Sequence, residues 1–196
     1  MQPNITPTEI HPLEPFLPPR AVLLMMGSFP PKRERWSMDF YYPNLQNDMW
    51  RIFGWIFFHN KNHFLREDKK AFCRERIAAF LEERGIALCD TGYEVARLKD
   101  NASDKFLEIV TPRDPAVLLE KLPYCRAIAT TGQKATETIL TMLPALEPKV
   151  GRFTEFPFGE RMIRLYRMPS SSRAYPRPIE EKAETYRKML AELGLL

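Results

Sequence analysis

The chain has 196 residues, a formal net charge of +4, and 44% hydrophobic and 28% charged residues, a composition that suits one folded domain. It holds 18 prolines but only 8 glycines, the reverse of ordinary usage, and many of the prolines fall near the N-terminus. We therefore expect a proline-rich, irregular arm over residues 1–20 and a single α/β domain over residues 21–196.

The sequence lacks features that several classes of protein and site require. No apolar run approaches the roughly 18 residues that a membrane span needs, and the first residues lack the basic and apolar regions of a secretory signal. Cys73, Cys89 and Cys125 show no Cys-x-x-Cys spacing, which argues against a disulfide framework and a four-cysteine metal site. His59 and His63 lack the acidic partner of a zinc motif. We expect a cytoplasmic protein without metal, cofactor or membrane contact.

Four short apolar runs have the length of strands. Continuous apolar runs bounded by turn residues are typical of strands that are buried on both faces of a parallel sheet. A glycine, Gly27, follows the first run directly. The runs are residues 21–26, 86–89, 126–130 and 162–166.

Helical patterns lie between and after these runs. Asp114 followed by a proline predicts a helix start, and Gly85 predicts a helix end. Because strands alternate with helices, we expect an α/β fold, a three-layer α/β/α sandwich with a central four-stranded parallel sheet, which would bind ligands at the carboxyl ends of its strands. The predicted helices are residues 47–58, 66–84, 114–122, 133–142 and 179–193.

The loop after the first predicted strand reads Gly27-Ser28-Phe29-Pro30-Pro31. A glycine at a strand end lets backbone amides approach a ligand closely, and the prolines restrict the loop by fixing φ. A stiff loop that carries an aromatic side chain is suited to hold a flat ring, although a packed turn is the commoner explanation of such a sequence.

The motif GSFP at residues 27–30, followed by YYxxxxNxxW over residues 41–50, resembles the uracil-DNA glycosylase superfamily. The resemblance is strongest to the branch of hypoxanthine (deoxyinosine) DNA glycosylases and mismatch-specific uracil glycosylases. Those proteins end in a short Pro-Ser-Ser/Thr-Ser loop after the last strand, and residues 168–173 read MPSSSR here. The resemblance implies a uracil-DNA glycosylase-like fold that binds double-stranded DNA with a damaged or mismatched base. We expect the protein to be a monomer.

Carried over residue by residue, the resemblance assigns a role to each matching position. Asn47 would be the catalytic residue, orienting the water that attacks the sugar. Thr131 and Gly132 would bind phosphate through backbone amides at a helix start, and Met168 would be an apolar wedge between base steps. The base-binding residues would be Gly27, Ser28, Phe29, Pro30, Tyr41, Tyr42 and Asp90, and the DNA-binding residues Thr131, Gly132, Met168, Pro169, Ser170, Ser171, Ser172 and Arg173.

Three residues depart from the family pattern: Phe29 replaces an aspartate or asparagine, Pro31 a glycine, and Met168 a histidine that some branches carry. The expected function is hydrolysis of the N-glycosidic bond of a deaminated base, hypoxanthine or uracil, flipped out of DNA. Two alternatives remain, a non-catalytic binder of damaged DNA with the same fold and an α/β enzyme that acts on free nucleotides. Asn47 is also suited to cap a helix.

Overall fold

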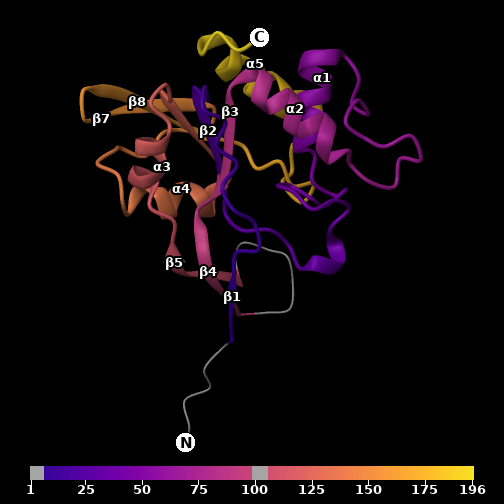
Figure 1. The fold of residues 1–196 in the computed structure, drawn as a ribbon, viewed down its shortest axis with the longest axis horizontal. Coiled ribbons are helices and arrows are strands. Elements are labelled where there is room, and N and C mark those ends of the chain that lie inside the picture. Colours follow the sequence, from indigo (N-terminus) through magenta and orange to yellow (C-terminus); the bar gives the residue numbers. More distant parts are fainter. Residues whose placement is uncertain (1–6, 99–105) are drawn as a thin grey trace, which may run out of the picture.

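The computed structural model describes residues 7–98 and 106–196. Within them, five strands form a main sheet in the order β3-β2-β6-β8-β7 and three form a second sheet in the order β1-β4-β5, with helices on both faces of the main sheet (Figure 1). The strands are β1 (Thr8–Ile10), β2 (Leu23–Gly27), β3 (Ile86–Asp90), β4 (Gly92–Arg97), β5 (Leu107–Pro112), β6 (Ala127–Thr131), β7 (Arg152–Phe158) and β8 (Arg161–Met168). The helices are a short 3-10 turn, η1 (Arg33–Arg35), and α1 (Met49–Phe58), α2 (Arg74–Arg84), α3 (Pro115–Lys121), α4 (Gln133–Leu140) and α5 (Ile179–Glu192).

The four predicted strands are present as β2, β3, β6 and β8, and they pair in parallel. The main sheet is nevertheless mixed, because β7 adds an antiparallel edge to β8, so the expectation of a four-stranded parallel sheet is corrected. The sequence of β7 lacks the continuous apolar run of its neighbours, since only Phe156 is buried along it. An edge strand needs few buried side chains, and its signal in the sequence is weak.

Alternate residues of the central strands pack against different helices. Leu23 and Met25 belong to the core beneath α1, α2 and α5, whereas Leu24 and Met26 belong to the core beneath α3 and α4. Because side chains of a strand point alternately to opposite faces, a strand covered on both faces has to be apolar throughout. This arrangement explains the unbroken apolar runs in the sequence.

The helices follow the predicted positions: α4 and α5 begin at the predicted residues, whereas α1, α2 and α3 begin later than predicted. Residues 66–73 form turns rather than the first turns of α2, and Lys69 has a φ of 56°, which an α-helix cannot contain. Gly85 ends α2 in the left-handed region, as predicted. In the described residues, no helix combines the length and the apolar character needed to cross a membrane.

The second sheet was not predicted, and it recruits part of the N-terminal arm. It lies at the end of the main sheet where the parallel strands finish (Figure 1). Within the arm, expected to be irregular, Thr8–Ile10 form β1 and pair with β4, and Phe16 exchanges two backbone hydrogen bonds with Leu88 of β3. The arm from residue 7 onward therefore runs along the edge of both sheets, while residues 1–6 lie outside the described residues.

Candidate functional site

A cavity of about 690 Å³ opens at the carboxyl ends of the four parallel strands. Gly27, Asp90 and Thr131, the last residues of β2, β3 and β6, lie in its wall, and we call these three residues the floor. Two loops far apart in the sequence complete the wall, through Asn44, Gln46 and Asn47 and through residues 170–173. We call residues 44–48 and 170–173 the rim. Of the predicted site residues, the cavity brings together Gly27, Ser28, Phe29, Pro30, Tyr42, Asn47, Asp90, Thr131, Ser170, Ser171, Ser172 and Arg173.

The floor is assembled by strand register. Gly27 pairs with Asp90 across β2 and β3, and a Cβ atom on Gly27 would lie only 2.6 Å from Asp90 Oδ1. The glycine is therefore required to make room for the carboxylate. Thr131 shares a hydrogen bond of 3.0 Å with the Tyr42 hydroxyl, and Tyr42 has a φ of 50°, a conformation that costs free energy in a residue of this size.

The loop after β2 is held in place by hydrogen bonds that its carbonyl groups accept. Arg97 donates a hydrogen bond of 2.8 Å to the carbonyl of Pro30, and the Trp36 indole donates one of 2.7 Å to the carbonyl of Pro31. The Arg97 guanidinium also lies 5.5 Å from the centre of the Phe29 ring, a cation–π distance. Phe29 remains partly exposed in the cavity wall, so a fixed aromatic surface faces the space where a ligand would lie.

Asn47 lies two residues before the first residue of α1, and the two polar atoms of its side chain have different surroundings. Its Oδ1 atom accepts a hydrogen bond of 3.0 Å from the backbone N–H of Met49, but the N-cap of α1 is Asp48, so the expectation that Asn47 caps the helix is corrected. The contact orients the amide, and Nδ2 is left without a partner among the described residues. Because Asn47 lines the cavity, this amide nitrogen can donate hydrogen bonds to a bound group.

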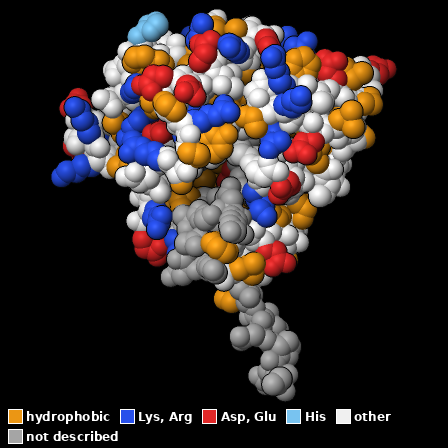
Figure 2. All heavy atoms as spheres, turned by 180° about the vertical axis from the view of Figure 1, so that it is seen from behind, with side chains coloured by type: hydrophobic (Ala, Val, Ile, Leu, Met, Phe, Trp, Pro, Cys, Tyr) orange, Lys and Arg blue, Asp and Glu red, His pale blue; other side chains and the backbone are white. Residues whose placement is uncertain are grey.

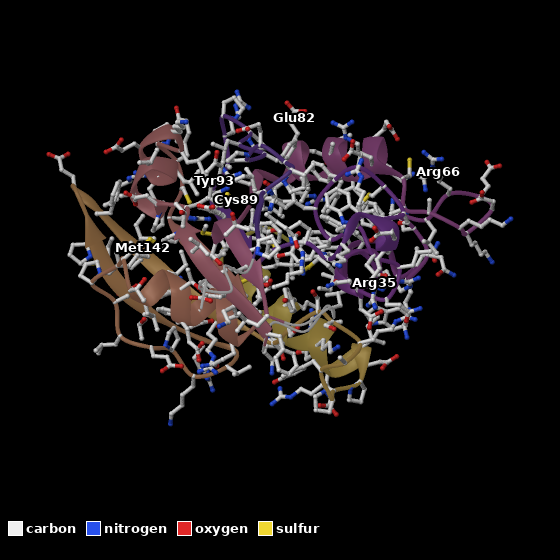
Figure 3. All side chains as sticks on the ribbon, turned by 90° about the horizontal axis from the view of Figure 1, so that it is seen from below. Arg35, Arg66, Glu82, Cys89, Tyr93 and Met142 are labelled. Atoms are coloured by element: carbon white, nitrogen blue, oxygen red, sulfur yellow. The ribbon has the colours of Figure 1, made fainter. Side chains whose placement is uncertain are left out.

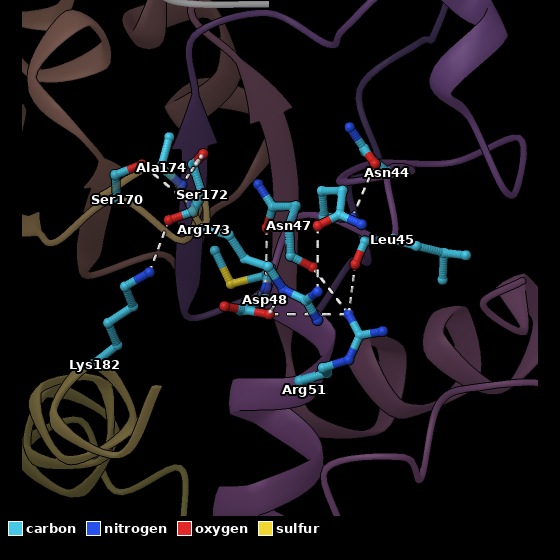
Figure 4. Close-up of polar contacts among 12 residues, drawn as sticks. Asn44, Leu45, Asn47, Asp48, Arg51, Ser170, Ser172, Arg173, Ala174 and Lys182 are labelled. Atoms are coloured by element: carbon cyan, nitrogen blue, oxygen red, sulfur yellow. Dashed lines mark hydrogen bonds and ion pairs between the residues drawn. The ribbon is translucent and has the colours of Figure 1, made fainter. Parts of the chain in front are cut away.

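The two rim loops are tied to one another (Figure 4). The backbone N–H of Asp48 donates to the carbonyl of Ser171 at 2.9 Å, and Arg173 Nε donates to Asp48 Oδ1 at 2.9 Å. From α5, the buried Lys182 donates a hydrogen bond of 2.7 Å to the carbonyl of Ser172. Burial, more than any other cause, lowers the pKa of Lys182; Asp48 opposes this effect, and Arg173 adds to it.

Tyr41, predicted to bind the base, does not reach the cavity. It is 2% exposed in the main core, and its hydroxyl donates a hydrogen bond of 3.0 Å to the carbonyl of Glu14 in the arm. Burial is also the main cause that raises its pKa far above the ordinary value. Tyr41 is therefore a core residue, and of the aromatic pair only Tyr42 faces the cavity.

Three predicted DNA contacts are likewise corrected. Met168 is 1% exposed and packs in the core, where it cannot act as a wedge between bases. Pro169 is buried, and its carbonyl accepts a hydrogen bond from Tyr186. The N–H of Gly132 donates to the carbonyl of Met168 at 3.2 Å, so this amide is not available to a phosphate. The loop begins to face outward only at Ser170.

His11 lies directly behind the floor, although nothing in the sequence around it predicts a role in the site. Its side chain is fully buried, and Nε2 lies 2.9 Å from Asp90 Oδ2. Its ring meets Phe29 edge to face, with centroids 5.0 Å apart. A histidine in a proline-rich arm gives no local signal of such a contact, because strand pairing far away in the sequence brings it there.

Among the described residues, no cysteine lines the cavity, whereas three basic residues do: Arg35, Arg97 and Arg173. Cys89 lies in the interior of the molecule (Figure 3), where burial raises the pKa of its thiol to about 12, so it is a poor nucleophile. On the face shown in Figure 2, Lys and Arg side chains are interspersed with Asp and Glu. In the described residues, His, Cys, Asp and Glu side chains form no group of three or more suited to hold a metal ion.

Comparisons with known proteins bear on the fold. No family model matches the sequence, and no curated protein matches it. The structure is similar to the solution NMR structure of a protein from Methanosarcina acetivorans described as a "putative Uracil DNA glycosylase". The two chains share 23% sequence identity, the match covers 91% of this chain and 96% of the other, and the TM-score is 0.57. This chain therefore has a uracil-DNA-glycosylase-like α/β fold.

Proposed function

We propose that the protein is a DNA glycosylase that hydrolyses the N-glycosidic bond of a deaminated base, hypoxanthine or uracil, flipped out of the duplex. The observation that supports it most is the convergence of three segments that carry the resemblance on one cavity: residues 27–30, Asn47 and residues 170–173. A cavity of this volume lies in the range of small-molecule sites. Base flipping requires a pocket of this kind beside a surface that can contact DNA.

The wall offers what a flipped base requires. The partly exposed Phe29 ring supplies a stacking surface, and stacking on an aromatic side chain contributes roughly 1–3 kcal/mol per base. Asn47, which lines the cavity, supplies in Nδ2 a hydrogen-bond donor for a water molecule or a base oxygen. As the bond breaks, negative charge develops on the base, and fixed donors stabilise it. We place the chain in the hypoxanthine and mismatch-specific uracil branch on the strength of its motifs.

The test is release of base from duplexes that carry a single inosine or a single uracil, followed by alkaline cleavage of the abasic product. We expect product with the wild-type protein and a loss of product in Asn47→Ala. Asn47→Ser retains an oxygen that can accept the hydrogen bond from the N–H of Met49, so its folding should be preserved while its rate falls like that of the alanine variant. Asn62→Ala, in an exposed loop, is the matched control and should keep the wild-type rate.

A second candidate is a protein of the same fold that binds damaged DNA without cleaving it. The hydrogen bond that Asn47 Oδ1 accepts from the N–H of Met49 favours it, because an oxygen engaged by the helix backbone is less available to orient water. Tight binding to lesion duplexes with no abasic product would support this candidate and contradict the first. Product from free nucleosides but not from duplexes would contradict both.

A further inference from the structure

We propose that Asp90, held by His11, is the general base that accepts the proton of the attacking water. The proposal rests on the proposed glycosylase function and goes beyond it, since the resemblance gives Asp90 only a contact with the base. Asp90 is the sole acidic residue among the described residues that line the cavity. A neutral amide such as Asn47 can orient a water molecule, but it cannot take up the proton that the reaction releases.

The two carboxylate oxygens of Asp90 are used differently. Oδ2 lies 2.9 Å from His11 Nε2. Oδ1 is directed toward Gly27, where it takes the space that a Cβ would fill, and it has no hydrogen-bond partner among the described residues. The residue is 6% exposed and lies in the cavity wall. One oxygen is therefore fixed by the protein, and the other remains available to a water molecule in the cavity.

His11 is itself held from several sides, so its orientation is not free. Its backbone N–H donates to the carbonyl of Tyr93 at 2.7 Å, and its ring stacks on Tyr41 with centroids 6.0 Å apart. Nδ1 lies 3.1 Å from the N–H of Leu13 and 3.0 Å from the carbonyl of the same residue. These backbone groups hold the ring so that Nε2 faces Asp90 Oδ2 at 2.9 Å, and this contact keeps the carboxylate in position.

The proposed hydrolysis needs only the flipped nucleotide, a water molecule and the Asp90 carboxylate. The bond between C1′ of the sugar and the base nitrogen breaks, and its electron pair leaves with the base. The water oxygen forms a bond to C1′ and gives one proton to Asp90 Oδ1. The proton then passes to solvent or to the departing base anion, and the carboxylate is restored. Before the transfer, the negative charge of Asp90 stabilises the positive charge that develops on the sugar.

The test compares single-turnover rates and duplex binding for the full chain, on duplexes with one uracil or one inosine. We expect Asp90→Asn to lower the rate at least 100-fold on every base that the wild type removes, as the loss of a general base does, with Kd for the duplex changed less than threefold. Asp90→Ala should be equally slow, and sodium formate should restore part of its rate, since the small carboxylate fits the vacated space. Glu160→Gln, on the exposed turn between β7 and β8, should match the wild type.

His11 is a positioning residue for Asp90. Its variants distinguish the effect of its hydrogen bond to Asp90 from the effect of its packing against Phe29 and Tyr41. His11→Ala should lower the rate about tenfold, and His11→Gln should recover much of it, because the glutamine amide can donate to Asp90. Both variants lose the aromatic contacts of the ring, so both should have a lower melting temperature. A rate that recovers in His11→Gln while the melting temperature does not would support positioning through the hydrogen bond. His59→Gln, exposed at the end of α1, is the control.

Each contrary outcome overturns a defined claim. An active wild type with Asp90→Asn within threefold of its rate would overturn the general base and leave the glycosylase function standing. A changed preference between uracil and inosine, with a normal rate on one, would show that Asp90 reads the base instead. Rates of His11→Ala equal to the wild type, or of His11→Gln equal to the alanine variant, would overturn the role of His11. Failure of the wild type on every lesion would overturn the function and this inference together.

Discussion

The floor and the rim of the cavity are built by different means. The floor residues end neighbouring parallel strands, and Asp90 and Thr131 are 6% and 7% exposed. The rim joins two loops through a small number of hydrogen bonds, and the Arg173 side chain within it is 45% exposed. A buried, sheet-anchored floor suits groups that must be placed accurately, whereas a rim of linked loops suits contacts with a large partner. Substitutions in the floor should therefore affect turnover, and substitutions in the rim should affect affinity for DNA.

Gly27→Ala should have the largest effect. The new Cβ would lie 2.6 Å from Asp90 Oδ1, closer than van der Waals contact permits, so the carboxylate must move. A displacement of about 1 Å at a reacting group can lower a rate about 100-fold. We expect a loss of this size in single-turnover assays, with duplex binding changed little. In an Asp90→Ala background the same substitution meets no carboxylate, and its additional effect on rate should be under threefold. An equal loss in both backgrounds would show that Gly27 acts independently of Asp90.

Lys182→Met should have a smaller effect, on binding rather than on stability. The substitution removes the hydrogen bond to the Ser172 carbonyl, but it also removes the cost of burying an ammonium group, and the two effects on stability offset each other. The rim loop is then held less firmly, so duplex binding should weaken about tenfold. Burial lowers the pKa of Lys182 below its ordinary value of 10.5. The unfolded chain therefore binds this proton more strongly, and the contribution of the group to stability rises as the pH approaches 10.5. Lys182→Met should remove that rise without lowering the melting temperature at neutral pH.

The control for this prediction is Lys188→Met, an exposed lysine on the same helix. It removes the same charge without touching the rim, so any general electrostatic loss of DNA affinity appears in both variants. Only the additional loss in Lys182→Met reports on the Ser172 contact. Equal losses in the two variants would show that the rim loop keeps its position without Lys182.

The difference between floor and rim also marks how far the sequence could predict the site. Strands buried on both faces have unbroken apolar runs, and the ends of those runs located Gly27, Asp90 and Thr131. The antiparallel strand β7 escaped prediction because an edge strand buries few residues. The short β1 escaped because three residues with partial burial carry no periodic pattern.

Contacts between distant segments could not be predicted at all. His11 reaches Asp90 only because β1 pairs with β4, and nothing in the residues around His11 indicates that pairing. Met168 and Tyr41 were expected at the surface from their motifs, but a motif does not state which of its members turns inward. In each strand or loop, burial is decided by what packs against it, and that partner is remote in sequence.

Arg173→Gln should have the smallest effect and gives a sharp test of the rim. Arg173 donates to Asp48 Oδ1 at 2.9 Å and faces the cavity, and a half-exposed ion pair of this kind contributes roughly 0.2–1 kcal/mol. We expect Kd for a lesion duplex to rise two- to fivefold, with turnover at saturating duplex reduced less than twofold. Arg187→Gln, exposed on α5, is the matched loss of charge.

If Arg173 also contacts a phosphate, the slope of log Kd against log salt concentration should fall by about 1. A normal slope with weaker binding would mean that Arg173 acts only by holding Asp48. A loss of turnover as large as that of Gly27→Ala would show that floor and rim do not divide catalysis from binding.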